Sequence, residues 1–323
     1  MKMRSGALAI VATVLLMVGG TASADAVTSD VDPESASTIA VRAADQAASQ
    51  GSGPGRQQTQ QPPGDAKKTE VEVSLPSDTT SPVEITSAGK RISMSLPDVK
   101  VRKAHQARNG SVVRDGVKTD LVIHRSSQAT KVMTVLADES APTAYQYCLQ
   151  GARLAALPGV DGAVGIFHGV SQQSSGPAVS ALHAIISKPW AVDASGRNLP
   201  TRYSINGECF TQTVDTKGAT FPVVADPSIE MVQWLPPIWI VTLNAKDQRI
   251  LVSSGGAAFG AAVGALLCSG STPVGAASCA ALGALVATAA TEIIKEYGIK
   301  EGCNLHVVVG LIGVQNAYRS GTC

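Results

Sequence analysis

The chain has 323 residues, of which 16% are charged, and a formal net charge of +1 at pH 7. Because one domain usually takes ~100–200 residues, two domains are expected. The near-neutral charge excludes the strongly basic surface of a typical nucleic-acid-binding protein and supplies no attraction to an anionic membrane.

Residues 1–24 have the three parts of a secretory signal peptide. Lys2 and Arg4 form a basic start, residues 7–18 are apolar, and residues 22–24 read Ala-Ser-Ala, a small-residue cleavage signal. An uncleaved membrane anchor is the alternative, but the apolar run is shorter than the ~20 residues that span a bilayer. We therefore predict cleavage after Ala24 and a secreted, extracellular protein. Its mature chain would be near −1, because two of 26 basic and none of 25 acidic residues are lost.

Residues 25–67 are poor in large apolar side chains and contain Gly-Ser-Gly-Pro-Gly, a Gln-rich run and Pro-Pro-Gly. A segment of this composition buries too little surface to offset its ordering entropy. Residues 36–48 are compatible with a transient helix. We predict that the whole segment is a disordered linker.

Between residues 68 and 228, apolar residues alternate with polar ones, and Gly-containing turn sequences separate the runs. A period of two with such turns predicts an antiparallel β-sandwich or open barrel. Residues 193–215 are predicted to form a hairpin, with Tyr203 and Ile205 opposite Phe210 and Thr213. The apolar positions that carry the pattern are Val71, Val73, Leu75, Val83, Ile85, Ile92, Met94, Leu96, Val112, Val113, Leu121, Val122 and Ile123.

Residues 229–323 are predicted to form a smaller domain built on a helical hairpin with a terminal β segment, so the predicted fold class is α+β. No charged residue occurs between Arg249 and Glu292. Small residues recur there at every fourth position, which places them on one helix face and lets two helix backbones approach closely. We predict helices ending near 267 and 297, with Ser253 or Ser254 capping the first and Gly298 ending the second. The predicted helix-packing seam is Gly256, Gly260, Gly264, Ala276, Ala280 and Ala284.

All six cysteines lie in the predicted mature chain, and none has the C-x-x-C spacing of a zinc site or a thiol oxidoreductase. An even number of cysteines in an exported protein favours disulfides. Six cysteines allow 15 connectivities, and proximity with domain membership favours one of them. The predicted pairs are Cys148–Cys209, Cys268–Cys279 and Cys303–Cys323.

Two stretches of the β-rich region resemble a module of secreted actinomycete proteins that also occurs in RHS-repeat and polymorphic-toxin-like proteins. They are Lys188-Pro-Trp-Ala-Val-Asp-Ala-Ser-Gly-Arg-Asn-Leu-Pro-Thr and Phe221-Pro-Val-Val-Ala-Asp-Pro. The C-terminal tail, Tyr318-Arg-Ser-Gly-Thr-Cys, is also similar to the end of a small-residue helical region in such proteins. The resemblance covers roughly residues 69–323. It implies a non-catalytic presentation module followed by an effector or surface-interaction tail, and it transfers no catalytic residue.

No catalytic, cofactor or metal site is predicted. The five histidines, at positions 105, 124, 168, 183 and 306, have no metal-ligand spacing to Cys, Asp or Glu. The glycines of residues 250–260 lack the Gly-x-Gly-x-x-Gly order of a dinucleotide site. There is no Gly-x-Ser-x-Gly, although a dispersed Ser-His-Asp triad needs only to meet in space.

The uncharged hairpin has two interpretations. In the first, it is a soluble helix pair that the segment around Trp234 and Trp239 and the terminal β segment shield. In the second, it inserts into membranes as helical bacteriocins do. Its first helix, ~21 Å at 1.5 Å per residue, is short for a ~30 Å hydrocarbon core, and no Lys-rich flank attracts anionic lipid. Soluble packing is the favoured interpretation.

Three functional hypotheses follow. The first is a secreted non-catalytic protein that presents a disulfide-stapled helical domain to a cell-envelope or protein partner, without binding nucleic acid. The alternative is a bacteriocin-like membrane-active effector that acts through the hairpin at residues 250–297. The second alternative is an unrecognised extracellular hydrolase.

Overall fold

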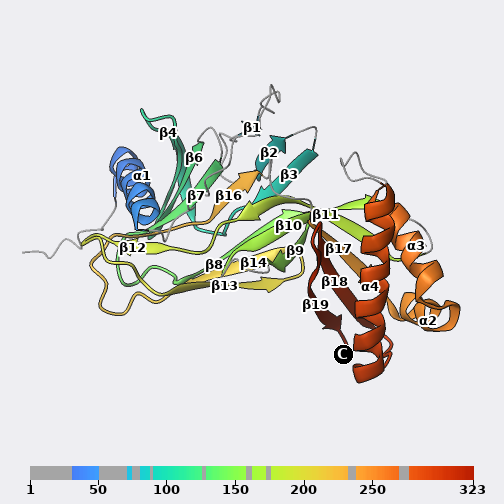
Figure 1. The fold of residues 1–323 in the computed structure, drawn as a ribbon. Helices are drawn as coiled ribbons and strands as arrows, with labels where there is room; N and C mark the ends of the chain where they lie inside the picture. Colours follow the sequence, from blue (N-terminus) through green and yellow to red (C-terminus); the bar gives the residue numbers. More distant parts are fainter. Residues whose placement is uncertain are drawn as a thin grey trace, which may run out of the picture.

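The computed structural model describes residues 31–50, 71–74, 81–87, 90–125, 129–157, 162–171, 176–231, 238–268 and 276–323. The predicted signal peptide lies outside these residues, as do positions 51–67 of the predicted linker. The described chain is α+β, with antiparallel sheets and a C-terminal group of helices, as predicted (Figure 1).

Two antiparallel sheets form the β-rich region. The smaller, called sheet A, has six strands. In spatial order they are β1 (Val71–Ser74), β2 (Val83–Ser87), β3 (Lys90–Ser95), β8 (Ala144–Gln150), β14 (Cys209–Val214) and β13 (Thr201–Asn206).

The larger, sheet B, has thirteen strands and runs through the whole molecule. Its main path is β19 (Gly313–Gly321), β18 (Cys303–Gly310), β17 (Ile238–Leu243), β11 (Ala178–Ile186), β16 (Ser228–Met231), β7 (Ala129–Leu136), β6 (Thr119–Arg125), β5 (Val112–Gly116) and β4 (Val101–Gln106). Four further strands pair beside this path: β9 (Arg153–Ala156) and β10 (Val164–Ser171) next to β11, and β12 (Ala191–Asp193) and β15 (Val223–Ala225) next to β7.

The two sheets pack face to face around one apolar core, so the region is a β-sandwich. Sheet A contributes Ile85, Tyr147 and Phe210 to this core, and sheet B contributes Val132 and Ile166. The rings of Tyr147 and Phe210 stack with centroids 5.1 Å apart. Alternating apolar residues thus meet between the sheets, as the period of two predicts.

The predicted hairpin of residues 193–215 is present as β13 and β14. Ile205 lies opposite Phe210, as predicted, whereas Tyr203 pairs with Gln212. β14 also pairs with β8, and this register sets Cys209 directly across from Cys148. The disulfide between them therefore joins neighbouring strands of sheet A.

The prediction of a disordered linker over all of residues 25–67 is wrong for its central part. Pro33–Ser49 forms helix α1, which lies on the face of sheet B that points away from sheet A (Figure 1). Asp32 caps it by accepting hydrogen bonds from the backbone N–H groups of Glu34 and Ser35. The segment was predicted to be disordered because it has few large apolar side chains. That reasoning failed for α1 because its alanines, which bury little surface themselves, pack closely against large apolar side chains of the sandwich.

The C-terminal region contains three helices: α2 (Ala245–Ser254), α3 (Gly256–Leu267) and α4 (Ala276–Tyr297). Residues 245–249 belong to α2, which Asn244 begins with a capping box. The predicted caps Ser253 and Ser254 instead end α2, where each hydroxyl donates to the carbonyl of Ile250. The N-cap of α3 is Gly255, and no side chain caps this helix.

The C-terminal strands continue sheet B instead of forming a separate sheet. β17 pairs on one side with β11 of the sandwich and on the other with β18. The helices cover one face of this extension and form their own apolar core with Trp239, Val241 and Val307. The predicted boundary at residues 228 and 229 therefore falls inside a continuous hydrogen-bonded sheet.

Candidate interaction surface

The contact between α3 and α4 depends on three glycines. A Cβ atom added at Gly283 would lie far inside contact distance of the Gly260 carbonyl oxygen and 2.6 Å from the Gly264 nitrogen. One added at Gly264 would lie 2.6 Å from the Cys279 carbonyl oxygen. Because real side chains do not approach backbone atoms so closely, only glycine permits this helix spacing.

The predicted seam is correct for two of its three α3 positions and is shifted on α4. Gly260 and Gly264 face α4, whereas Gly256 is exposed at the start of α3. The side chains of Ala280 and Ala284 are exposed, and only their backbone atoms flank the contact; Ala276 is the first residue of α4. Sequence reasoning missed Gly283, although a glycine inside an uncharged helix was itself a signal of close approach.

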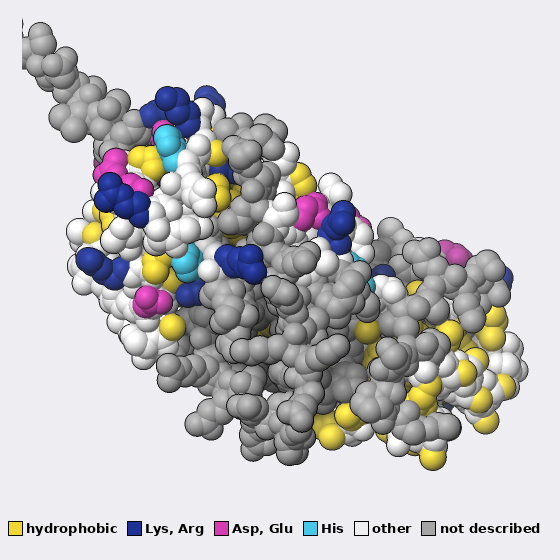
Figure 2. Space-filling view, turned by 90° about the horizontal axis from the view of Figure 1, so that it is seen from above, with side chains coloured by type: hydrophobic (Ala, Val, Ile, Leu, Met, Phe, Trp, Pro, Cys, Tyr) yellow, Lys and Arg dark blue, Asp and Glu magenta, His cyan; other side chains and the backbone are white. Residues whose placement is uncertain are grey.

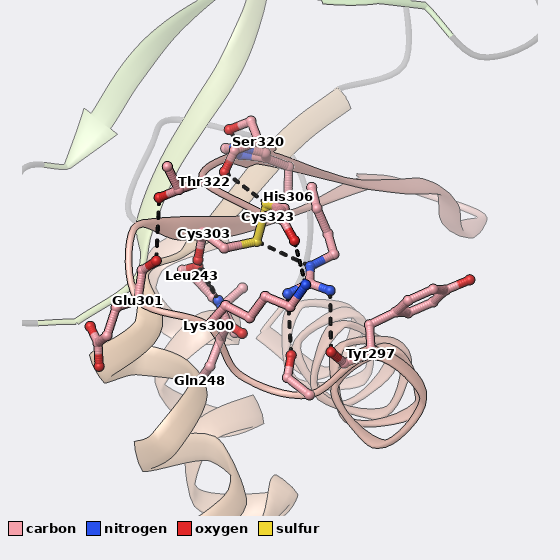
Figure 3. The surroundings of a disulfide bond; sticks show 12 residues. Leu243, Gln248, Tyr297, Lys300, Glu301, Cys303, His306, Ser320, Thr322 and Cys323 are labelled. Carbon is pink, nitrogen blue, oxygen red and sulfur yellow. Dashed lines mark hydrogen bonds between the residues drawn. A yellow bond between two sulfur atoms is a disulfide. The ribbon is translucent and has the colours of Figure 1, made fainter.

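Two disulfides close the ends of this region. Cys268–Cys279 joins the end of α3 to the first turns of α4. Cys303–Cys323 joins the start of β18 to the end of the chain (Figure 3). All six cysteines are paired as predicted, and three disulfides fit an extracellular protein.

Polar contacts hold the C-terminal tail around the second disulfide (Figure 3). Lys300 Nζ donates to the Cys323 carbonyl oxygen at 2.5 Å, and the amide of Gln248 donates to the carbonyls of Leu243 and Cys303. Arg319 donates to the carbonyls of Tyr297 and Gly298 at the end of α4. A cation at this position complements the helix dipole and satisfies terminal carbonyl groups. Gly298 ends α4 with a φ of 69°, as predicted for a C-cap.

The side of α3 and α4 that points away from the sheet is exposed and uncharged. We call it the outer face; its exposed residues are Ala257, Ala258, Ala261, Ala262, Ala265, Ala277, Ser278, Ala280, Ala281, Ala284 and Leu285. Figure 2 shows hydrophobic side chains gathered over this end of the molecule. A helix that is apolar on all sides is normally covered on all sides. Among the described residues, the inner side of these helices is packed and the outer face is exposed.

Larger apolar side chains adjoin the outer face at the turn between β18 and β19. Leu285 of α4 is 47% exposed, Leu311 is 45% exposed and Ile312 is 92% exposed. A Cβ added at Gly313 in this turn would lie 3.6 Å from Leu285 Cδ1. The turn and the outer face thus form one apolar surface.

By length and composition, one helix of the described chain qualifies as a membrane span: residues Ala277–Tyr297, with 39% of the apolar window buried. Its charged residues Glu292, Lys295 and Glu296 lie in the last turns. The uncharged part, 276–291, measures ~24 Å at 1.5 Å per residue, less than the ~30 Å of a hydrocarbon core.

The two stretches that carry the family resemblance lie side by side. β12 pairs with β15, with Ala191 opposite Ala225 and Asp193 opposite Val223. The Asp226 carboxylate accepts hydrogen bonds from the Trp190 N–H at 2.9 Å, the Gln212 amide at 3.0 Å and the Tyr203 hydroxyl at 2.9 Å. The motif residues therefore tie three segments of the sandwich together, which is a structural role.

Burial raises the pKa of Asp226 to about 7, although its three donors favour the ionised form. Burial, together with the charge on Asp226, also raises the pKa of Tyr203 well above its usual value. A carboxyl with a raised pKa is a candidate general acid or base. Asp226 is fully buried, however, and its hydrogen bonds are all internal.

Two Ser–His pairs in the described structure bear on the hydrolase hypothesis. Ser111 contacts His124 Nδ1 at 2.9 Å, but Ser111 is fully buried. The exposed Ser320 contacts His306 Nε2 at 2.7 Å, and Arg153 contacts His306 Nδ1 at 2.9 Å. A guanidinium only donates, so Nδ1 accepts and Nε2 carries the proton.

A general base must accept the serine proton at Nε2, with an acceptor behind Nδ1. The pair of Ser320 and His306 has the opposite arrangement. Burial and the charge of Arg153 lower the pKa of His306 to about 4. Neither Ser–His pair thus has the arrangement of an activated serine nucleophile.

Within the described ranges, no group of three or more His, Cys, Asp or Glu residues is arranged to hold a metal ion. His168 and His183 contact each other edge to face, with ring centroids 5.1 Å apart.

No protein-family model, curated protein or solved structure matches this chain. Function is therefore inferred from its residues and their geometry.

Proposed function

We propose that this is a secreted, non-catalytic binding protein and that the outer face of the α3–α4 hairpin is its binding surface. The observation that carries the proposal is an exposed, uncharged helix-pair face whose opposite side is already packed against sheet B. Burial of this apolar face against a partner removes it from water, which is favourable.

The partner is a cell-envelope component or a protein that presents an uncharged, apolar helix or groove. Alanines let a partner helix approach closely, and Leu285, Leu311 and Ile312 supply larger anchors beside them. The three disulfides, the predicted signal peptide and the resemblance to secreted presentation modules support an extracellular setting.

The test is to place a charge on the outer face of the full-length protein. The double variant carries Ala261→Glu and Ala281→Glu. Both positions are exposed, so the protein is expected to fold as wild type does. In the complex the two carboxylates would be buried against an apolar partner, which weakens binding. Ala48→Glu, at an exposed position on α1, is the matched control. Labelled wild-type and control proteins are expected to bind cell-envelope fractions at least tenfold better than the double variant. Equal binding of all three, or hydrolytic turnover in a broad substrate screen, contradicts the proposal.

A second candidate function is membrane activity, which the apolar length of α4 favours. An assay of dye leakage from liposomes of neutral and of anionic lipid distinguishes membrane activity from binding to a protein partner. Leakage that the double variant abolishes indicates a membrane target. Envelope binding that protease treatment of the envelope abolishes, without leakage, indicates a protein partner.

A further inference from the structure

Helix α1 is bound to the sandwich through one apolar side. On β7, Val132 and Leu136 point into the core between the sheets, whereas Met133 and Val135 point toward α1. The surface that α1 covers, here called the docking face, consists of Ala107, Val113, Val122, Met133, Val135, Trp190, Val192 and Val224.

The buried inward positions of α1 are all occupied by small residues, whereas Ile39 packs against the docking face but is only partly buried. Ala36, Ser37, Ala40, Ala43, Ala44 and Ala47 are the buried residues of this helix. They recur at the three- and four-residue spacing of one helix face. At these buried positions the large side chains of the contact come from the sandwich, so the helix backbone lies close to it.

Three polar contacts fix the direction and register of α1. Near its start the Glu34 carboxylate accepts from the Arg108 N–H at 3.2 Å, and the Ser37 hydroxyl donates to Asn109 Oδ1 at 2.9 Å. Near its end Gln46 Nε2 donates to the Gly196 carbonyl oxygen at 2.8 Å. Asp45 and Lys131 add an ion pair at 4.0 Å.

No disulfide ties α1 to the sandwich, because residues 31–50 contain no cysteine. Twenty-one residues, 50–70, separate α1 from β1 in the sequence. The described contacts of α1 with the docking face are therefore all noncovalent, and the covalent connection through residues 50–70 raises the local concentration of α1.

We propose that the docking face is a helix-binding site, that α1 is its resident ligand, and that the site accepts in trans an N-capped helix with alanine or serine at every inward position. The inward positions exclude bulky side chains, since the helix backbone lies close to Trp190 and Met133. Glu34 and Gln46 supply the polar ends that give the ligand its direction.

The experiment uses the full chain with a specific protease site inserted within the Gly-Ser-Gly-Pro-Gly sequence at residues 51–55. After cleavage, α1 is expected to co-elute with the rest of the protein. A fluorescently labelled peptide of residues 31–50 is then expected to exchange into the site, measured by fluorescence anisotropy. Because cleavage leaves every described residue present, a failure to bind is not caused by missing sequence.

Two competitor peptides carry the same substitution on opposite sides of the helix. Ala40 is fully buried against the docking face, whereas Ala48 is exposed. The Ala40→Leu peptide is expected to compete at least tenfold more weakly than wild type, and the Ala48→Leu peptide as well as wild type. Equal competition by both peptides, an α1 that never exchanges, or loss of the folded sandwich on cleavage overturns the proposal.

Discussion

Replacement of Gly283 by alanine tests whether close backbone approach defines the hairpin. In an exposed helix, glycine to alanine is favourable by ~1 kcal/mol, because alanine has the higher helix propensity. At Gly283 the new Cβ meets backbone atoms of Gly260 and Gly264, which cannot rotate away as a side chain can. We therefore expect the opposite sign.

The magnitude follows from the same geometry. Overpacking of a well-packed contact costs ~1–3 kcal/mol. We expect a cost at the upper end of this range for Gly283→Ala, because α3 and α4 must separate along their whole contact to make room for the new Cβ. After the propensity gain is subtracted, Gly283→Ala is expected to lower the free energy of unfolding by about 2 kcal/mol. Urea unfolding followed by the fluorescence of Trp239, which is buried in the core beneath these helices, measures the change.

Gly256→Ala is the matched control. It is a glycine of the same hairpin, in α3, but a Cβ there meets only Ala287 Cβ, at an ordinary 3.8 Å. This variant is expected to be as stable as wild type or slightly more stable. The reasoning is refuted if Gly283→Ala unfolds at the wild-type urea concentration or above, or if the two variants behave alike.

Two further predictions concern pH. The pKa of Asp226 is raised from 3.8 to about 7, so its contribution to stability is complete below pH 3.8 and is lost as the pH rises through 7. Asp226→Asn preserves the shape: its amide oxygen can accept from Trp190 and Gln212, and its NH2 group can donate to the Tyr203 hydroxyl oxygen. The unfolding midpoint of this variant should fall less than that of wild type between pH 4 and 7. The pKa of His306 is lowered from 6.5 to about 4, so its contribution is complete above pH 6.5 and is lost as the pH falls through 4. His306→Gln should therefore lose less stability than wild type when the pH is lowered from 7 to 4. If the urea midpoint of either variant changes with pH as that of wild type does, the pKa shift assigned to that residue is wrong.

The disulfide pairs, the β-sandwich and the α3–α4 hairpin followed from local sequence signals. Alternation and turn glycines act over short distances along the chain, so they predict elements and neighbours. The even cysteine count of the whole chain, with proximity and domain membership, predicted the pairs. The hairpin register between Ile205 and Phe210 is a case in point. The run Leu121-Val122-Ile123 also indicated a strand, and its lack of alternation was an unused sign that both faces of β6 are covered.

Other features depended on residues far apart in sequence. The docked position of α1 requires Trp190 and Met133, which lie more than eighty residues away from its alanines. Arg319, which contacts the end of α4, and Arg153, which fixes the tautomer of His306, carry no local motif.

The sequence by itself determined the β-rich region, the helical hairpin of α3 and α4, the cysteine pairs, and that residues 250–291 are uncharged; it did not determine α1 or α2. Only the tertiary structure decided which side of each helix is covered. The glycines and alanines of α3 and α4 are chemically alike, so sequence spacing cannot say whether Gly283 or Ala284 meets the opposite helix. That choice depends on how the hairpin lies on sheet B, and this packing leaves the outer face exposed.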